Sequence, residues 1–91
     1  MVVLSIQENE VVLIVRLKEM MEAYRQKTGE RLTYQELADR VGVARTTIES
    51  IASRPDYNAG LRTIARICAA LECAPGELLS LLPVAQNKKE Q

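Results

Sequence analysis

The chain has 91 residues with 12 Lys and Arg, 12 Asp and Glu and no His, so its formal net charge is zero. This length allows one domain, and the 47% hydrophobic content is enough for a small core. Lack of His, with only two Cys as strong nucleophiles, argues against an enzyme, and balanced charge excludes a strongly basic protein that coats nucleic acid.

The two cysteines, Cys68 and Cys73, set limits on metal binding and location. A structural zinc site needs about four ligands, so we expect no metal and no cofactor. Small secreted proteins held by disulfides usually contain more cysteines, which favours reduced thiols in a cytoplasmic protein. The N-terminus lacks a basic segment and is interrupted by polar residues 7–10, so neither a signal peptide nor a membrane span is expected.

Residues 1–15 are predicted to form an apolar β arm. Two runs rich in β-branched residues, 2–6 and 11–15, flank the polar residues 7–10. This pattern is typical of a β-hairpin with a four-residue turn, or of two separate strands.

Helical periodicity begins at Arg16 and predicts five helices. The first carries Leu17, Met20, Met21 and Tyr24 on one face and ends at Gly29. The others are expected at about 34–41, 45–53, 61–71 and 75–82. The helix at 61–71 is predicted to bury Leu61, Ile64, Ile67, Cys68 and Leu71. Pro75 suits the first turn of the last helix, and residues 83–91 are expected to be a polar tail.

The segment from Thr33 to Ile51 predicts a helix-turn-helix unit. Thr33 and Glu36 have the spacing of a capping box at a helix start. Ala38 is small where two helices cross, and Gly42 permits a tight turn. Two helices joined in this way form a unit whose second helix can enter the major groove of DNA. The second helix is anchored on the core by Ile48 and Ile51 and presents Arg45, Thr46, Glu49 and Ser50 outward.

Two segments, LTYQELADRVGVARTTIESI and LRTIARICAALECAPGELL, resemble the Cro and lambda-repressor-like (XRE-type) family of helix-turn-helix domains. The resemblance spans about Arg16 to Leu82. It implies a mainly α fold: a five-helix DNA-binding bundle over 16–82, preceded here by the β arm.

The resemblance also implies roles for single residues. Arg45, Thr46 and Ser50 match positions that read base edges, and Arg45 could pair with guanine. Glu49 either accepts from a cytosine amine or pairs with Arg45 one turn away, and we favour the pairing. Tyr34 contacts phosphate or lies on the rim of the core, and each basic residue has the alternative of a solvated surface charge. The expected phosphate contacts are Thr33, Tyr34, Arg54, Asn58 and Arg62.

The function predicted on these grounds is a sequence-specific, double-stranded DNA-binding transcriptional regulator of bacterial or phage type. Residues 16–66 hold ten basic and seven acidic side chains, a modest surplus that predicts weak non-specific binding and a homodimer on a pseudo-palindrome. The arm either pairs subunits, which we favour, or covers its own bundle. The alternative function is an antitoxin-like or adaptor module that holds a protein partner.

Overall fold

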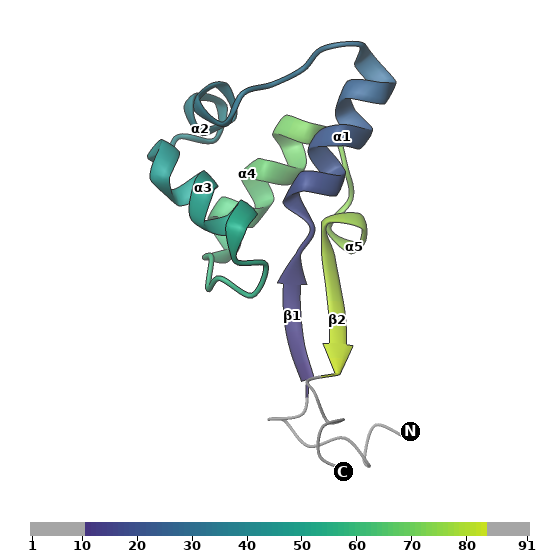
Figure 1. Ribbon diagram of the computed structural model, residues 1–91, viewed down its shortest axis with the longest axis vertical. Coiled ribbons are helices and arrows are strands. Elements are labelled where there is room, and N and C mark those ends of the chain that lie inside the picture. Colours follow the sequence, from purple (N-terminus) through teal and green to yellow (C-terminus); the bar gives the residue numbers. More distant parts are fainter. Residues whose placement is uncertain (1–10, 84–91) are drawn as a thin grey trace.

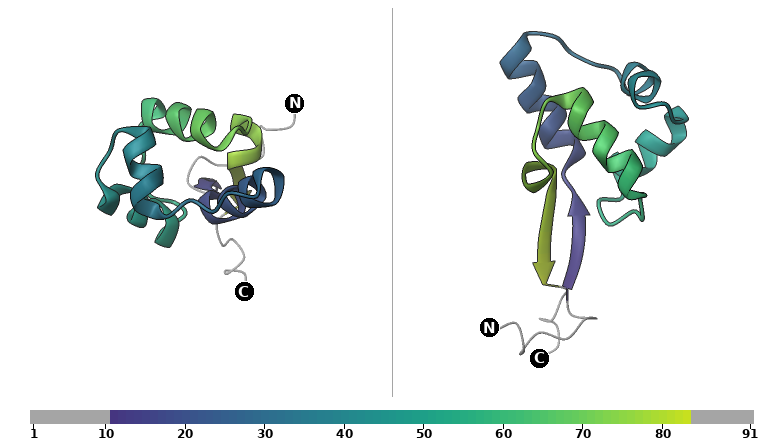
Figure 2. Two further views of the ribbon diagram at one scale, coloured as in Figure 1. Left: turned by 90° about the horizontal axis from the view of Figure 1, so that it is seen from above. Right: turned by 180° about the vertical axis from the view of Figure 1, so that it is seen from behind.

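The computed structural model describes residues 11–83, which form five helices and two strands. The helices pack around one core, and the strands form an antiparallel ribbon that projects from the bundle at the end opposite the α1–α2 connection (Figure 1). Two further views show α2 and α3 on one flank and the ribbon extending away from the helices (Figure 2). In chain order the elements are β1 Val11–Val15, α1 Leu17–Thr28, α2 Tyr34–Val41, α3 Arg45–Ser53, α4 Leu61–Leu71, α5 Pro75–Leu78 and β2 Leu79–Pro83.

The core is almost wholly aliphatic, and every helix contributes to it. No polar or charged residue among 11–83 is buried, so burial of apolar surface stabilises the bundle without costly buried polar groups. No helix in this range is long and apolar enough to cross a lipid bilayer. Side chains with at most 1% exposure are Leu17, Leu37, Ala38, Val41, Ile48, Ile51, Ile67, Leu71 and Leu78.

The predicted signals at helix ends are confirmed. The Thr33 hydroxyl accepts a hydrogen bond from the Glu36 amide at 3.0 Å, and the Glu36 carboxylate accepts one from the Thr33 amide at 2.8 Å. This reciprocal pair satisfies two amides that the helix itself leaves without partners. Gly29 and Gly42 end α1 and α2 in the left-handed conformation.

β1 has a partner that the sequence analysis did not predict, whereas the predicted hairpin with residues 2–6, or the alternative of two separate strands, stays a prediction. β1 pairs with β2, and Val11 lies opposite Pro83 and Val15 opposite Leu79. Residues 2–6 lie outside the described range. The apolar run of β1 therefore has a partner that is far away in the sequence, which no local turn pattern announces.

The fifth helix is shorter than predicted. It ends at Leu78 rather than Leu82, and Leu79–Pro83 continues as β2. Pro83 thus belongs to a strand and not to the tail. Leucine has a high helix propensity, but propensity is a weak preference that tertiary contacts override, and here β1 supplies the competing contacts.

One predicted core residue is on the surface. Leu61, the first residue of α4, is 82% exposed, whereas Ile64, Ile67, Cys68 and Leu71 are buried as predicted. The helical spacing places Leu61 on the apolar face, but α4 begins where the neighbouring helices no longer cover it.

Glu72 is the only non-glycine residue with positive φ among residues 11–83, at 54°. It ends α4, and its carbonyl accepts a hydrogen bond from Lys27 Nζ at 2.9 Å. Because a left-handed backbone costs an L-residue about 1–2 kcal/mol, Glu72→Gly is expected to raise the free energy of unfolding by about 1 kcal/mol. Glu72→Ala is the matched control, since it removes the same carboxylate but keeps the strain. Urea denaturation that finds the two variants equally stable contradicts this account.

Candidate nucleic-acid interface

The turn between α2 and α3 is fixed by hydrogen bonds to one carbonyl. The Ala38 carbonyl accepts from the amides of Gly42 at 2.7 Å and Val43 at 3.1 Å. Gly42 has φ 84°, which strains any residue with a Cβ, and a Cβ there would also lie 3.4 Å from Arg66 Nη1. The fully buried Ala38 lets the helices approach closely. This local geometry sets the angle at which α3 leaves the bundle.

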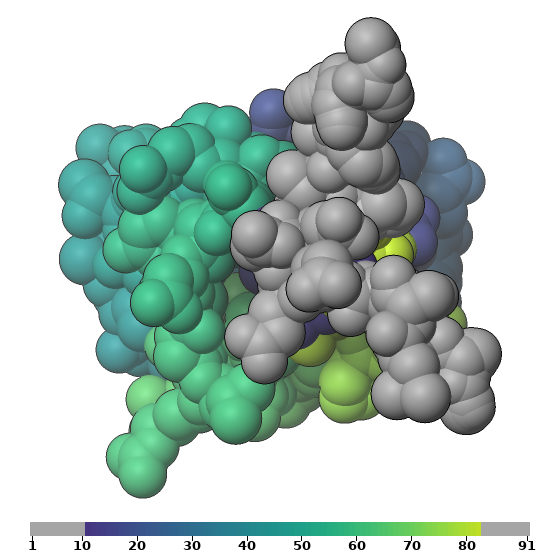
Figure 3. Space-filling view, turned by 90° about the horizontal axis from the view of Figure 1, so that it is seen from below, coloured from purple at the N-terminus to yellow at the C-terminus, as the bar shows by residue number. Residues whose placement is uncertain are grey.

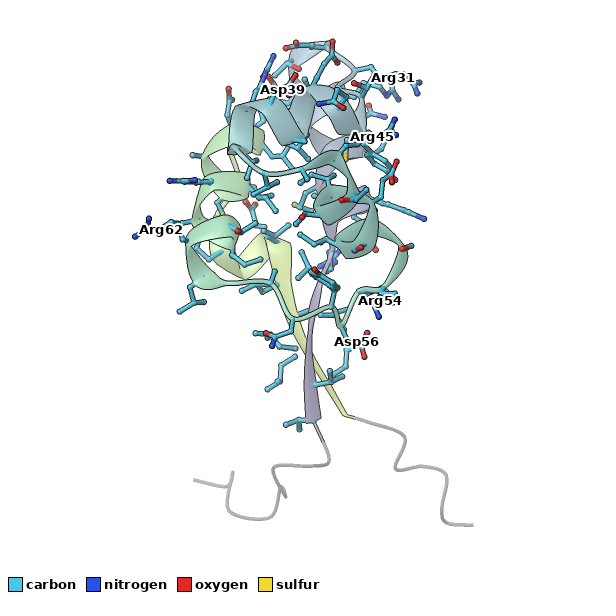
Figure 4. The ribbon with its side chains drawn as sticks, turned by 90° about the vertical axis from the view of Figure 1, so that its left-hand side faces the viewer. Arg31, Asp39, Arg45, Arg54, Asp56 and Arg62 are labelled. Atoms are coloured by element: carbon cyan, nitrogen blue, oxygen red, sulfur yellow. The ribbon has the colours of Figure 1, made fainter. Side chains whose placement is uncertain are left out.

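α3 has one buried face and one polar face. Ile48, Ile51 and Ala52 are buried, which fixes the rotation of the helix about its own axis. As predicted, the opposite face carries the four side chains proposed to read bases. Arg45 and Thr46 are exposed, and Glu49 and Ser50 are half-buried. The view onto this flank shows Arg45 on its right-hand side, below Arg31 and above Arg54 (Figure 4).

Arg45 and Glu49 form the ion pair that their spacing suggested. Arg45 Nε lies 3.4 Å from Glu49 Oε2, and both side chains are about half exposed. An exposed pair of this kind contributes only about 0.3–0.5 kcal/mol to stability. Its main consequence is that Glu49 partly neutralises Arg45 and adds a negative charge to this face.

Glu49→Gln is therefore expected to strengthen non-specific DNA binding. Removing one negative charge a few Å from a phosphate corresponds to about 1 kcal/mol in water, or about fivefold in affinity. Fluorescence anisotropy titration with DNA of scrambled sequence measures this non-specific affinity. Glu19→Gln on α1 serves as the charge-matched control. If both variants gain the same affinity for DNA, the effect comes from net charge and not from the position of Glu49.

The start of α2 lies beside a small basic cleft. Tyr34 packs partly against the core, as one of its two alternatives expects, and it also lines this cleft of about 210 Å³. Thr33 is engaged in the capping box, although its hydroxyl proton stays available to a further acceptor. The cleft is lined by Lys18, Met21, Glu22, Arg25, Arg31, Leu32 and Tyr34.

Arg31 is a candidate contact that the sequence interpretation missed. It is exposed and lies on the same flank as Arg45 (Figure 4). In the cleft, Arg25 is bound to Glu22, and hydrogen bonds from Arg25 and Gln26 lower the pKa of Glu22 to about 2. No described carboxylate forms an ion pair with Lys18 or Arg31. The signal that could have identified Arg31 is its place just before a capping box, because the start of a helix favours a bound anion such as phosphate.

The loop between α3 and α4 brings the remaining candidates onto the same flank. Arg54 and Arg62 lie at opposite margins of this surface, and Asp56 lies near Arg54 (Figure 4). The Arg54 guanidinium stacks over the Tyr57 ring with 5.0 Å to its centroid, which limits the directions it can take. Asn58 is exposed in the same loop. From the ribbon end, the loop and the start of α4 form a continuous part of the surface (Figure 3).

The surroundings of Cys73 disfavour its thiolate form. Cys68 is buried and Cys73 half-buried, and both are free thiols. Burial and the neighbouring Cys68 raise the pKa of Cys73 to about 11, which suppresses the thiolate that a nucleophile or metal ligand needs. Residues 11–83 contain no group of three or more His, Cys, Asp or Glu placed to hold a metal ion.

Comparisons with known proteins agree with this geometry. A family model described as the Cro/C1-type HTH DNA-binding domain matches residues 16–83. The chain is also similar in fold to SinR, the master regulator for biofilm formation, in a crystal structure in complex with DNA. That match has a TM-score of 0.50 and 24% identity and covers 65% of this chain and 90% of that one. No curated protein matches significantly. The predicted fold class, a mainly α bundle with a β arm, is confirmed.

Proposed function

Because the chain belongs to the Cro/C1-type helix-turn-helix DNA-binding domain family, we propose that it is a sequence-specific regulator of transcription that binds double-stranded DNA. The observation that carries this proposal is the polar face of α3, which exposes Arg45 and Thr46 while Ile48 and Ile51 are fully buried. The likeness to SinR, which was crystallised with DNA, supports it.

In this proposal α3 enters the major groove with its N-terminal end foremost. Arg45 leaves Glu49 and donates two hydrogen bonds to guanine O6 and N7, a contact worth about 1–3 kcal/mol of discrimination. Thr46 contacts a thymine methyl group, and Ser50 donates or accepts without strong base preference. Glu49 either stays near Arg45 or accepts from a cytosine amine.

Phosphate contacts flank α3 on two sides. At the start of α2 they come from Thr33 and Tyr34, and we add Arg31, which lies exposed beside them. At the α3–α4 loop they come from Arg54, Asn58 and Arg62. The face is of mixed charge, since Asp39 and Asp56 lie among the arginines (Figure 4). Non-specific attraction is therefore weak.

Weak attraction by one domain favours two copies acting together. A homodimer on a pseudo-palindrome places two α3 helices in successive major grooves, about 34 Å apart. Each copy then reads one half-site, and the combined contacts supply the affinity that a neutral domain lacks.

Selection of bound sequences from a random DNA pool, followed by titration at several salt concentrations, tests the proposal. We expect a two-fold symmetric consensus and a complex that weakens with salt. Arg62→Ala is expected to lower the slope of log affinity against log salt by about 1 for each copy, or about 2 for the dimer. Lys27→Ala is the matched control, because Lys27 pairs with Glu72 at the far end of α1.

Absence of any selected sequence refutes the proposal. Co-purification of a tightly bound protein together with that absence favours a protein-interaction module instead.

A further inference from the structure

The β1–β2 ribbon is apolar on both faces. Ser80 is its only polar residue, and neither strand carries a charge. Leu13 and Leu81 lie opposite each other on one face and are 52% and 63% exposed, while Leu82 on the other face is 41% exposed. An antiparallel ribbon that faces water usually alternates polar and apolar residues. This composition is typical of strands that are covered on both sides.

The backbone hydrogen bonds identify which groups point away from the ribbon. The Arg16 amide donates to the Leu78 carbonyl at 2.7 Å, toward the β2 side, and the Val15 amide donates to the Pro55 carbonyl at 2.8 Å, on the opposite side. Successive residues of a strand point their amides to alternate sides. The amides and carbonyls of Val11 and Leu13 therefore point outward from β1, whereas those of Val12 and Ile14 point toward β2.

The two outer edges of the ribbon differ. At the β2 edge the Leu79 amide already donates to the Pro75 carbonyl, and Pro83 has no amide hydrogen, which leaves only Leu81 as a donor. At the β1 edge, Val11 and Leu13 both offer a donor and an acceptor, and no described backbone group is hydrogen-bonded to them on that side. The edge of β1 is therefore the one suited to receive another strand.

We propose that β1 of a second copy of this chain occupies this edge and gives a sheet of four strands, two from each copy. Antiparallel pairing of a strand with itself is two-fold symmetric, so one surface supplies both halves of the interface. Because β1 has no charge, two copies meet without like-charge repulsion. The inference rests on the dimer of the proposed function and assigns its interface.

The α3–α4 loop determines the register. The outward amide of Val15 already donates to the Pro55 carbonyl. The incoming strand therefore pairs with Val11 to Leu13. Outward groups must meet outward groups, and the register that pairs the outward groups of Val11 and Leu13 with each other has its two-fold axis at Val12. Val12 then faces the same residue of the second copy, and each Val11 exchanges hydrogen bonds with Leu13 of the other copy.

Proline substitutions at two opposite positions test which edge is used. Leu13→Pro removes an outward amide of β1 and no β1–β2 hydrogen bond, and Leu81→Pro does the same on β2. Sedimentation of the full chain without DNA is expected to give a dimer for the wild type and for Leu81→Pro, and a monomer for Leu13→Pro. A monomeric wild type overturns the inference, as happens if residues 2–6 of the same chain cover the edge. A Leu13→Pro variant that still forms dimers also overturns it.

Cross-linking keeps the test decisive if the proline variants fail to fold. Facing Val12 residues would have Cα atoms about 4.5 Å apart, within the range of about 4.4–6.8 Å that a disulfide spans. Mild oxidation of Val12→Cys is expected to give a covalent dimer on a non-reducing gel. Leu13→Cys is the control, because its two copies are diagonal neighbours about 7–8 Å apart. If Val12→Cys forms no more covalent dimer than Leu13→Cys, the inference is overturned. Selection of a DNA half-site by the same chain shows separately whether the DNA-binding proposal stands.

Discussion

Replacing Arg45 and Thr46 together by alanine is expected to weaken binding to the selected DNA sequence by about 100-fold or more. One bidentate arginine–guanine contact is worth about 1–3 kcal/mol, and a dimer loses this contact twice. Both side chains are exposed, so the loss comes from DNA contacts and not from folding. Fluorescence anisotropy on the selected and the scrambled sequence, at one salt concentration, measures the change.

Lys27→Ala serves as the control for this double variant. It also removes a positive charge, but from the C-terminal end of α1, and we expect less than a twofold change in specific binding. The thermal midpoint of the double variant should stay within a few degrees of the wild type, since exposed substitutions usually change stability by less than about 0.5 kcal/mol. Undiminished specific binding by the double variant would show that the start of α3 does not read the bases.

Ile48→Ala is expected to lower the free energy of unfolding by about 2–5 kcal/mol, the usual cost of a cavity left by a large aliphatic side chain. Ile48 is fully buried, and it holds α3 on the core at the point where the polar face is presented. Because small domains are stable by only about 5–15 kcal/mol, this loss removes a large part of the total. Urea denaturation followed by circular dichroism measures it.

Leu61→Ala is the matched control for the cavity. It removes a similar aliphatic side chain from a position that is 82% exposed, so we expect a change below about 0.5 kcal/mol. Equal losses in the two variants contradict the packing described for α3. The Ile48→Ala protein should also lose specific DNA binding near its new midpoint of urea denaturation, because the orientation of Arg45 depends on the packing of Ile48.

The sequence predicted the parts of the fold whose signals are local. Thr33 and Glu36 form a capping box because their spacing allows two reciprocal hydrogen bonds and nothing else is required. Gly42 and Ala38 mark the turn and the helix crossing for equally local reasons: one permits a left-handed backbone, and the other leaves room for a second helix. These residues position α3, and so the face that carries the candidate site was predictable.

The ribbon was not predictable from the same reasoning. Val11 and Pro83, the first and last described residues, pair with each other, and no short pattern encodes which of two distant apolar runs meet. The run from Leu79 to Leu82 fits a helix as well as a strand, and the choice depends on the presence of β1. Arg31 was missed for a related reason, since only the folded chain shows that the loop before α2 lies on the same flank as Arg45.

The hydrogen bond from the Val15 amide to the Pro55 carbonyl joins β1 to the α3–α4 loop. In a dimer built on β1, any contact that holds the strand also restricts the segment carrying Arg54, so less conformational entropy remains to be lost when DNA binds. Thermodynamic linkage then requires reciprocity: DNA must tighten the association of two copies by the same factor by which their association tightens the grip on DNA. The 2.8 Å hydrogen bond between Val15 and Pro55 would thus couple dimer formation to DNA binding.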